Sequence, residues 1–255
     1  MQITDTHTHL YADEFASDRD LLINEAIAKG VQRFFLPNID STSVEALTQL
    51  SDKYPENCFP MMGLHPCSVK ENWQEEMNLV EKLLSEKKYV AVGEIGMDLF
   101  WDKTFVKEQG VVFRRQIELA NHYILPVSIH SRESFEEIYT ILLDRKKEMP
   151  CGVFHCFTGN LDQAKRAIDL GFYLGIGGVV TFKNSGLDKV IAEIPLQHLV
   201  LETDSPYLAP VPFRGKRNQP EYIIKVAEKI AEIKNVPVEE VASVTTQNSK
   251  IIFGV

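Results

Sequence analysis

Residues 3–10 read ITDTHTHL, a short strand-like run at residues 3–6 that leads into two histidines one residue apart. On a β-strand, side chains two residues apart point to the same side. His7 and His9 can therefore offer two imidazoles to one cation, as zinc-class metal sites do. A chance pair of neighbouring histidines is the alternative, so the interpretation depends on which residues stand at the ends of the other strands.

Strand-like and helix-like patterns alternate along the rest of the chain. Apolar, β-branched runs predict eight strands, at residues 3–6, 32–37, 59–63, 90–94, 126–130, 152–155, 172–176 and 199–203. Apolar residues at helical spacing predict helices at residues 18–29, 43–53, 75–88, 106–122, 134–147 and 161–169. Two further helices are predicted after the eighth strand, at residues 220–234 and 237–253.

This alternation predicts a sheet of parallel strands joined by helices. The near-continuous apolar run at residues 33–36 suits a sheet that is buried on both faces. Eight strand–helix units in about 250 residues fit a closed (β/α)8 TIM barrel, an α/β fold, and an open doubly wound sheet is the alternative. Because no linker or low-complexity tract divides the sequence, we expect one domain over residues 1–255.

The composition indicates a globular protein of the cytoplasm. Of the 255 residues, 44% are hydrophobic and 25% are charged. No apolar run approaches the ~20 residues of a membrane helix, and the first residues lack the features of a secretory signal. The four cysteines form no CxxC motif or disulfide framework. The net charge of −9 repels polyanions at long range, so a nucleic-acid partner would need local positive charge or metal ions.

Histidines and acids recur where the predicted strands end. Five of the seven histidines do so: His7, His9, His65, His130 and His155. Glu94 and Asp204 lie at the ends of the fourth and eighth strands. In a (β/α)8 barrel the C-terminal ends of the strands meet at one face, which carries the chemistry. Ordinary core or surface histidines would not be expected to gather at these positions, so the pattern favours a metal site.

These residues fit a site for two metal ions. We expect His7, His9 and Asp204 to hold one ion, and His130 and His155 to hold the other. Glu94 can bridge the two ions, because a carboxylate has two oxygens with several lone pairs. Two ions about 3.5–4 Å apart can clamp the attacking and leaving oxygens of a phosphoryl displacement. Taken singly, Glu94 and Asp204 could equally be helix caps or members of surface ion pairs.

Several other residues are candidates for substrate binding. Arg132 follows a proposed ligand by two residues and can reach a phosphate, and a surface salt bridge is the alternative. Arg214, Lys216 and Arg217 form the densest positive cluster of the chain, next to the end of the eighth strand, and could steer a phosphate backbone. Phe100 and Trp101 follow the fourth strand and could stack on a base or simply pack a long loop.

Eight motifs occur in order over nearly the whole chain: DTHTHL, GLHP, VGEIGMD, HSR, HCFTG, ETDSP, RGKRNQP and TTQNSKIIF. They give the chain a resemblance to the TatD family of metal-dependent deoxyribonucleases. It implies a (β/α)8 barrel, divalent metals, and ligands that correspond to His7, His9, Glu94, His130, His155 and Asp204. His65 corresponds to a histidine near the scissile phosphate. Met97 stands where the family often has leucine, a mild apolar exchange.

The resemblance implies hydrolysis of nucleic-acid phosphodiesters, with exonuclease action from the 3′ end of single-stranded DNA. We expect Glu94, Asp204 and His65 to be the catalytic residues, with Asp204 taking a proton from the attacking water. We expect single-stranded DNA or DNA strand ends as the partner, with RNA left open, and we infer no membrane or protein partner.

Two other functions remain open from the sequence. One is a metal-dependent amide or ester hydrolase, including an aminoacyl-tRNA deacylase, on the same barrel. The other is a non-enzymatic binding module, which is disfavoured because a ligand set with room for water is typical of catalytic sites. The identity of the two divalent ions stays open among Mg, Mn and Zn. Imidazoles favour transition metals, whereas the family's nuclease chemistry is associated with magnesium.

Overall fold

The computed structural model describes residues 1–144 and 150–255. Its strands all run parallel to their neighbours. The strands are β1 (Ile3–Asp5), β2 (Val31–Leu36), β3 (Cys58–Pro60), β4 (Val92–Asp98), β5 (Val127–Arg132), β6 (Gly152–Phe154), β7 (Phe172–Ile176) and β8 (Leu199–Leu201). Each one overlaps a strand that the sequence predicts, although several ends differ by a few residues.

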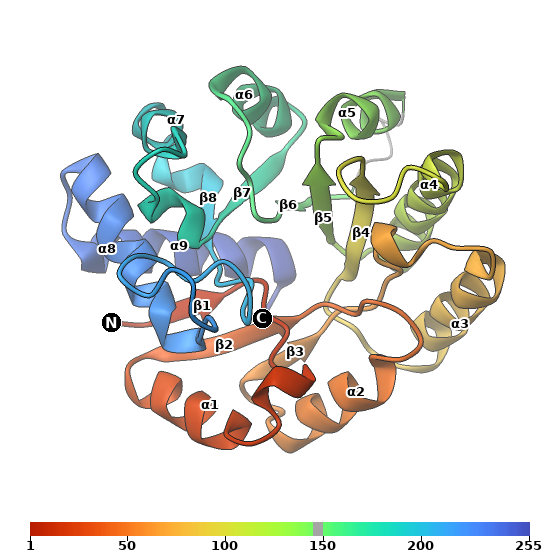
Figure 1. Ribbon diagram of the computed structural model, residues 1–255, viewed down its shortest axis with the longest axis horizontal. Helices are drawn as coiled ribbons and strands as arrows, with labels where there is room; N and C mark the ends of the chain where they lie inside the picture. Colours follow the sequence, from red (N-terminus) through yellow and green to blue (C-terminus); the bar gives the residue numbers. More distant parts are fainter. Residues whose placement is uncertain (145–149) are drawn as a thin grey trace.

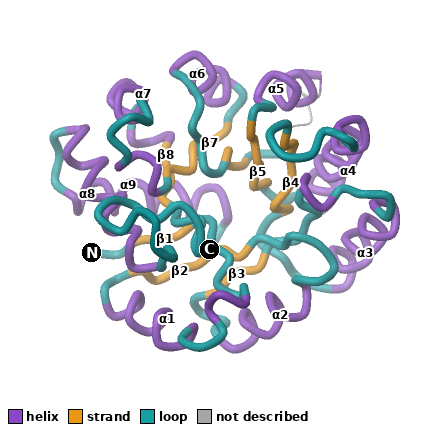
Figure 2. Tube along the Cα trace, in the orientation of Figure 1, coloured by secondary structure: helices purple, strands orange, loops and turns teal. Residues whose placement is uncertain are grey.

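The eight strands close into a barrel. Most of the strand pairing lies within two sheets, β1-β2-β3 and β4-β5-β6-β7-β8. Backbone hydrogen bonds join them at both seams. The amide of Gly93 donates to Met62 O at 3.1 Å, and the amide of Thr6 donates to Leu201 O at 2.9 Å. The strands form a central ring in Figure 2, which confirms the predicted (β/α)8 barrel and excludes the open sheet.

Most of the α-helices surround this ring of strands, and α9 (Val238–Phe253) lies behind the ring in the view of Figure 1. The others are α1 (Arg19–Ala28), α2 (Val44–Lys53), α3 (Trp73–Glu86), α4 (Val106–Tyr123), α5 (Phe135–Asp144), α6 (Leu161–Asp169), α7 (Leu187–Glu193) and α8 (Ile223–Lys234). Short 3-10 turns precede some of them, including η1 (Asp13–Phe15) and η6 (Pro220–Tyr222). The last residues of the helix predicted at 134–147 lie outside the described residues.

Helix α7 was not predicted from the sequence. It has only seven residues, which is too short to show a clear helical period. It follows Gly186, whose φ of 73° is left-handed and suits glycine. Leu187 and Ile191 are buried one turn apart, so packing rather than a strong local pattern maintains this helix.

Alternate strand residues pack on opposite sides of the barrel wall. Phe34 and Leu36 belong to the large core between strands and helices, whereas Phe35 belongs to a second, smaller cluster. Phe253, the last residue of α9, packs against Phe35 with ring centroids 4.3 Å apart. The alternation follows from the two-residue period of a strand. It gives the barrel a packed apolar interior and leaves the strand ends for polar side chains.

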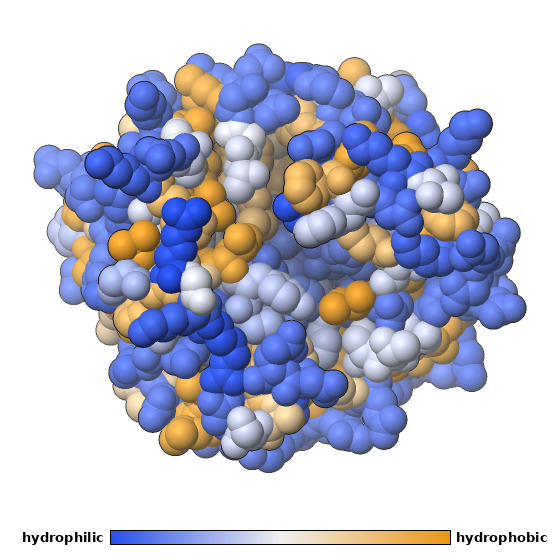
Figure 3. Space-filling view, in the orientation of Figure 1, coloured by the Kyte–Doolittle hydropathy of each residue, from blue (hydrophilic) through white to orange (hydrophobic). Residues whose placement is uncertain are grey.

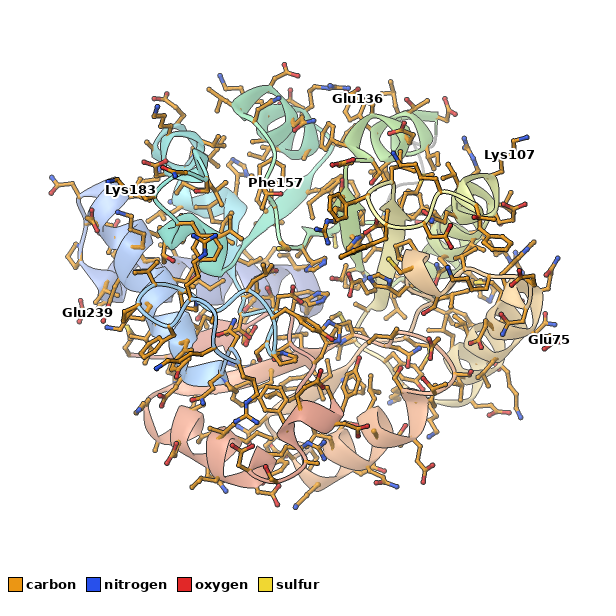
Figure 4. All side chains as sticks on the ribbon, viewed as in Figure 1. Glu75, Lys107, Glu136, Phe157, Lys183 and Glu239 are labelled. Atoms are coloured by element: carbon orange, nitrogen blue, oxygen red, sulfur yellow. The ribbon has the colours of Figure 1, made fainter. Side chains whose placement is uncertain are left out.

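Charged side chains lie mainly on the outside. Figure 4 labels five exposed ones, which project away from the barrel: Glu75, Lys107, Glu136, Lys183 and Glu239. Phe157, also labelled there, is only 5% exposed. Within the described residues, no helix combines the length and the apolar character needed to cross a lipid bilayer.

Candidate metal centre

A large cavity opens at the C-terminal ends of the strands. Its volume is about 590 Å³, and a hollow is visible near the centre of the face in Figure 3. Its lining includes six of the histidines and acids that the sequence singled out: His9, His65, Glu94, His130, His155 and Asp204. His7 lies behind them and is fully buried. The structure therefore gathers residues from both ends of the chain around one cavity.

One oxygen of the Glu94 carboxylate faces the histidines that follow β1. Glu94 Oε2 lies 3.1 Å from His7 Nε2 and 3.7 Å from His9 Nε2. Asp204 Oδ1 approaches the same two nitrogens, at 3.9 Å from His7 and 3.5 Å from His9. Two imidazoles and two carboxylates thus lie close together, and their assignment to a first ion stays a prediction.

The other oxygen of Glu94 faces a second group of histidines. Oε1 lies 2.8 Å from His130 Nδ1, 2.8 Å from His155 Nε2 and 3.2 Å from His65 Nε2. Each oxygen of this single carboxylate therefore belongs to a different set of imidazoles. Such a division is what a bridging ligand requires, and Glu94 is only 2% exposed.

A chain of hydrogen bonds sets the tautomer of His9. The Tyr11 hydroxyl donates to Pro37 O at 2.6 Å, so its oxygen is left to accept a bond from His9 Nδ1, 2.8 Å away. In a neutral ring the proton is then on Nδ1, and the lone pair is on Nε2. That lone pair points toward Glu94 and Asp204, as a metal ligand needs.

Asp98 orients His130 in the same manner. Its Oδ2 lies 2.9 Å from His130 Nε2, while its Oδ1 accepts from the amides of Phe100 and Trp101. A carboxylate can only accept, so a neutral His130 carries its proton on Nε2 and turns the Nδ1 lone pair to Glu94. Asp98 stands in the VGEIGMD motif, but its contact with His130 was not predicted.

Glu202 lies next to His155 but forms no hydrogen bond with it. It is fully buried, accepts from the Cys156 amide at 2.6 Å, and has its Oε1 3.6 Å from His155 Nδ1. Neither His155 Nδ1 nor Glu202 Oε2 has a hydrogen-bond partner among the described residues. The space is available because residue 175 is glycine: a Cβ there would lie 2.2 Å from Glu202 Oε2. Glu202 was not predicted as a site residue, although the ETDSP motif contains it.

His65 has a different protonation pattern. Its Nδ1 accepts a hydrogen bond from the Cys67 amide at 3.0 Å. A neutral His65 therefore carries its proton on Nε2, the nitrogen that faces Glu94 at 3.2 Å. This histidine presents a hydrogen-bond donor to the cavity rather than a lone pair, which separates it chemically from the other imidazoles.

Mutual charge keeps the acids of this cluster ionised. Burial opposes the charge of Glu94, yet the neighbouring imidazoles of His155 and His65 hold the pKa of its carboxyl well below the usual range. Burial also opposes the charge of Asp204, and His9, whose Nε2 lies 3.5 Å from Asp204 Oδ1, leads the effects that lower its pKa overall. For His7, burial lowers the pKa to about 4, and nearby His155 acts in the same direction. His7 is thus neutral at pH 7 and keeps a lone pair on one of its two ring nitrogens.

The donor set fits divalent metal ions. Three overlapping groups each bring their ligand atoms within 4.8 Å of one another: His7 with His9 and Glu94, His7 with His155 and Asp204, and His65 with Glu94 and His130. Imidazole and carboxylate together suit zinc and other transition metals, and the carboxylates also suit magnesium or manganese. The individual ligand assignments remain predictions, but all six predicted ligands lie together.

The basic residues singled out from the sequence lie in different surroundings. Arg132 lines the cavity, and its guanidinium lies 3.9 Å from the Phe100 ring centroid. The cavity lining, as described, does not include Arg214, Lys216 or Arg217. Arg214 lies over Phe182 at 4.5 Å, and Lys216 is exposed.

Arg217 forms part of a contact between the loop after β8 and the start of α1. Its guanidinium bonds both carboxylate oxygens of Asp18, at 3.0 and 2.5 Å, and also donates to Glu14 O. It lies 4.9 Å from the Phe15 ring centroid. Arg217 thus has structural partners, and a role in substrate binding stays a prediction for it, as for Arg214 and Lys216.

Known proteins resemble this chain over nearly its full length. The family model described as TatD related DNase matches residues 4–254. A metal-dependent hydrolase of Bacillus subtilis, YabD, is 40% identical over 250 residues, covering 98% of each chain. Another metal-dependent hydrolase, YcfH of Escherichia coli, is 36% identical over 259 residues, covering 99% of this chain and 96% of its own.

Solved structures agree with this relationship. The crystal structure of YjjV, a TatD homologue of Escherichia coli, matches with a TM-score of 0.93 and 31% identity, over 99% of this chain and 98% of its own. A TatD family hydrolase of Entamoeba histolytica has a TM-score of 0.84 at 22% identity, over 99% of this chain and 98% of its own, which supports the fold alone. The chain therefore belongs to the TatD-related DNase family of metal-dependent hydrolases.

Proposed function

We propose that this protein is a metal-dependent phosphodiesterase that shortens single-stranded DNA from its 3′ end. One observation carries the proposal: the two carboxylate oxygens of Glu94 face two different groups of histidines. A bridged pair of ions is the arrangement used by many phosphatases, polymerases and nucleases. DNA as the substrate and the direction of digestion come from the family relationship.

The proposed ligands divide between two divalent ions. His7, His9 and Asp204 would hold one, His130 and His155 the other, and Glu94 would bridge them. When bound, the ions supply Lewis acidity and activate water as a nucleophile. The fixed orientation of His9 by Tyr11 and of His130 by Asp98 supports this assignment, since ligating histidines usually donate their second N–H to a neighbour.

Other residues have roles of their own in the proposed reaction. Asp204 belongs to the first proposed ligand group, where its carboxylate can also accept the proton that the attacking water loses. His65 Nε2–H can donate to a phosphate oxygen, because its Nδ1 is occupied by the Cys67 amide. Arg132, at the cavity wall, supplies a charge that suits the phosphodiester anion.

A strand end is a better fit than a long duplex. The net charge of −9 disfavours a broad polyanion track. The described lining of the cavity contains one arginine, Arg132, and its volume of about 590 Å³ is in the range of small-ligand pockets. Local positive charge would come chiefly from the ions. We also propose a cytoplasmic location, which suits four free thiols.

The test uses protein stripped of metal, with defined addition of Mg²⁺, Mn²⁺ or Zn²⁺. The substrates are 5′-labelled and 3′-labelled single strands, duplexes, closed circles and RNA. We expect no cleavage without metal, and a ladder that shortens stepwise from the 3′ end of single strands when metal is restored. Immediate cutting in mid-strand, or linearisation of circles, would contradict exonuclease action.

The same panel includes simple amides, esters and an aminoacyl-tRNA. Hydrolysis of these substrates in the absence of any phosphodiester cleavage would replace the proposed function with an amide or ester hydrolase. We expect phosphodiesters to be preferred, because the donor at His65 and the cation at Arg132 both suit an anionic substrate.

A further inference from the structure

Two exposed aromatic side chains line the cavity from opposite sides of the barrel. Trp101 follows β4 and is 67% exposed, and Tyr207 follows β8 and is 49% exposed. Both belong to the lining of the cavity that holds Glu94. Strands four apart in a closed ring of eight lie across from each other, so the two rings approach the proposed ions from opposite walls.

The loop and its neighbours hold Trp101 in position despite its exposure. Its amide donates to Asp98 Oδ1 at 3.0 Å, and Asp98 also orients His130. The Phe100 ring packs edge to face with the indole, with centroids 4.9 Å apart. The Arg132 guanidinium lies 3.9 Å from the Phe100 centroid and 5.0 Å from the Trp101 ring. A large flat ring is thus fixed beside a cation at the cavity wall.

Tyr207 is fixed on the other side. Its amide donates to Asp204 O at 2.8 Å, and its carbonyl accepts from the buried amide of Asn218 at 2.7 Å. Its ring centroid lies 6.0 Å from that of His9. Both aromatic platforms are therefore coupled through short contacts to proposed metal ligands or to residues that orient them.

We propose that Trp101 and Tyr207 are stacking platforms for unpaired nucleobases on either side of the scissile phosphate. This deepens the proposed function and rests on it. The occupant is the end of a single strand, because an unpaired base has open faces whereas bases within a duplex already stack on their neighbours. Base–aromatic stacking is worth ~1–3 kcal/mol per base and tolerates any sequence. The adjacent Arg132 suits the phosphate that joins such bases.

Fluorescence can detect the contact without any cleavage. The chain has two tryptophans, at positions 73 and 101, so Trp73→Phe leaves Trp101 as the reporter. The metal-loaded variant is titrated with a short thymidine strand whose phosphorothioate linkages slow hydrolysis. We expect saturable quenching of Trp101 by this strand, and none by an abasic strand of equal length and charge. Equal quenching by both strands, or by neither, would overturn the Trp101 platform.

Kinetics then measure what the platforms contribute. Trp101→Ala should raise KM for single strands by about 5- to 150-fold, the range that corresponds to one lost stack. KM for the abasic strand, kcat and metal content should not change, and Trp101→Phe should restore most of the affinity. Tyr207→Ala should act in the same sense. Ile251→Ala, which removes a 61% exposed side chain on α9, is the matched control.

The two proposals fail in different ways. If Trp101→Ala raises KM equally for abasic and base-bearing strands, or has no effect on either, the platforms are wrong while the nuclease stands. If base-bearing strands quench Trp101 but no phosphodiester is cleaved with any metal, the platforms stand and the proposed function is wrong.

Discussion

Glu94 is the residue whose geometry says most about this site. A side chain with two equivalent oxygens lies among five imidazoles: those of His7, His9, His65, His130 and His155. Replacing one oxygen by an amide nitrogen keeps the shape but substitutes a donor for an acceptor on one side. We therefore expect this change to weaken metal binding at both ion positions.

We expect Glu94→Gln to lower metal affinity and activity by at least ~10–100-fold, the usual cost of disturbing a ligand or its support. Elemental analysis of the purified protein and digestion of labelled DNA provide the measurements. Glu75→Gln, on the exposed face of α3, is the matched control. A Glu94→Gln protein with full metal occupancy and full turnover would remove Glu94 from the site.

Asp204→Asn tests the proposed proton acceptor. The amide keeps one oxygen near His9, at the position that is now 3.5 Å from its Nε2, but loses basicity. We expect kcat to fall by ~10²–10⁴-fold, the usual loss of a general base, with DNA binding and the fold retained. Circular dichroism checks that the fold is retained, and binding to labelled strands checks that DNA affinity is retained. Near-normal kcat with the metals bound would direct attention to His65.

A substitution at Gly175 tests whether Glu202 positions His155. A methyl group there would lie 2.2 Å from Glu202 Oε2 and 3.1 Å from His155 Cα, so Glu202 must move. We expect Gly175→Ala to weaken metal binding by ~10–100-fold, measured by calorimetry with the metal-free protein.

Gly110→Ala is the matched control for this change. It lies in α4, where a Cβ would meet nothing closer than 3.9 Å, so it should leave metal affinity intact and stabilise the helix by about 0.5–1 kcal/mol. If Gly175→Ala binds metal as well as Gly110→Ala does, Glu202 has no positioning role.

The predicted ligands could be found from sequence because each follows an apolar run. The residues that orient them could not. Asp98 and Glu202 stand in recognisable motifs, but which ring each one meets depends on how neighbouring strands pack. The contact between Arg217 and Asp18 could not be predicted either, because it joins segments about 200 positions apart in the sequence.

At the level of elements, the sequence predicts the strands well and their ends less well. β4 extends to Asp98, four residues beyond the predicted end at Glu94. Gly93 and Gly96 weaken the local strand signal, yet Gly96 pairs with His130 in the ladder to β5. A hydrogen-bonded neighbour therefore extends the strand where local preference alone would end it.

The loop between β8 and α8 is attached to α1 by the pair of Arg217 and Asp18. A double-mutant cycle with alanine at both positions should give a coupling of ~0.2–1 kcal/mol, as for other accessible ion pairs. The Arg217 hydrogen bond holds the pKa of Asp18 below its ordinary value of 3.8. The coupling is therefore present above that value and is lost as the pH falls through the lowered pKa.

Denaturant unfolding at pH 7 and at low pH measures this coupling. Activity separates the two roles of Arg217. If Arg217 acts only through the loop, Asp18→Ala will reproduce the KM of Arg217→Ala at every salt concentration. If Arg217→Ala alone flattens the salt dependence of binding, the arginine contacts phosphate directly.

For the whole molecule, alternating patterns were enough to predict a parallel α/β barrel. These patterns fit a closed barrel but left an open doubly wound sheet as the alternative, and the backbone hydrogen bond between the first and last strands decides between the two. The short helix α7 and the exact strand lengths also depend on packing over the entire barrel. The overall topology is therefore set by local patterns, whereas the fine geometry of the site is not.

We expect removal of metal to lower the melting temperature without unfolding the protein. The apolar core is extensive, and the ligand residues pair with one another through charge and hydrogen bonds. Metal at 100 times its dissociation constant should add about 2.7 kcal/mol per ion, or roughly 5–10 °C for a chain of this size. Calorimetry with and without chelator measures the shift. Loss of far-ultraviolet dichroism at 25 °C on chelation would contradict it.

The pairing of β1 with β8 also has a consequence for the chain while it is being translated. His7 and Asp204 meet only after the last strand docks, and the Asp204 amide bonds His7 O at 2.9 Å. A nascent chain on the ribosome carries its first two histidines early but lacks its proposed proton acceptor until some 200 residues have been translated. Under the proposed function, an unfinished polypeptide is harmless to the nucleic acid around it, and hydrolytic capacity arises only when the barrel is complete.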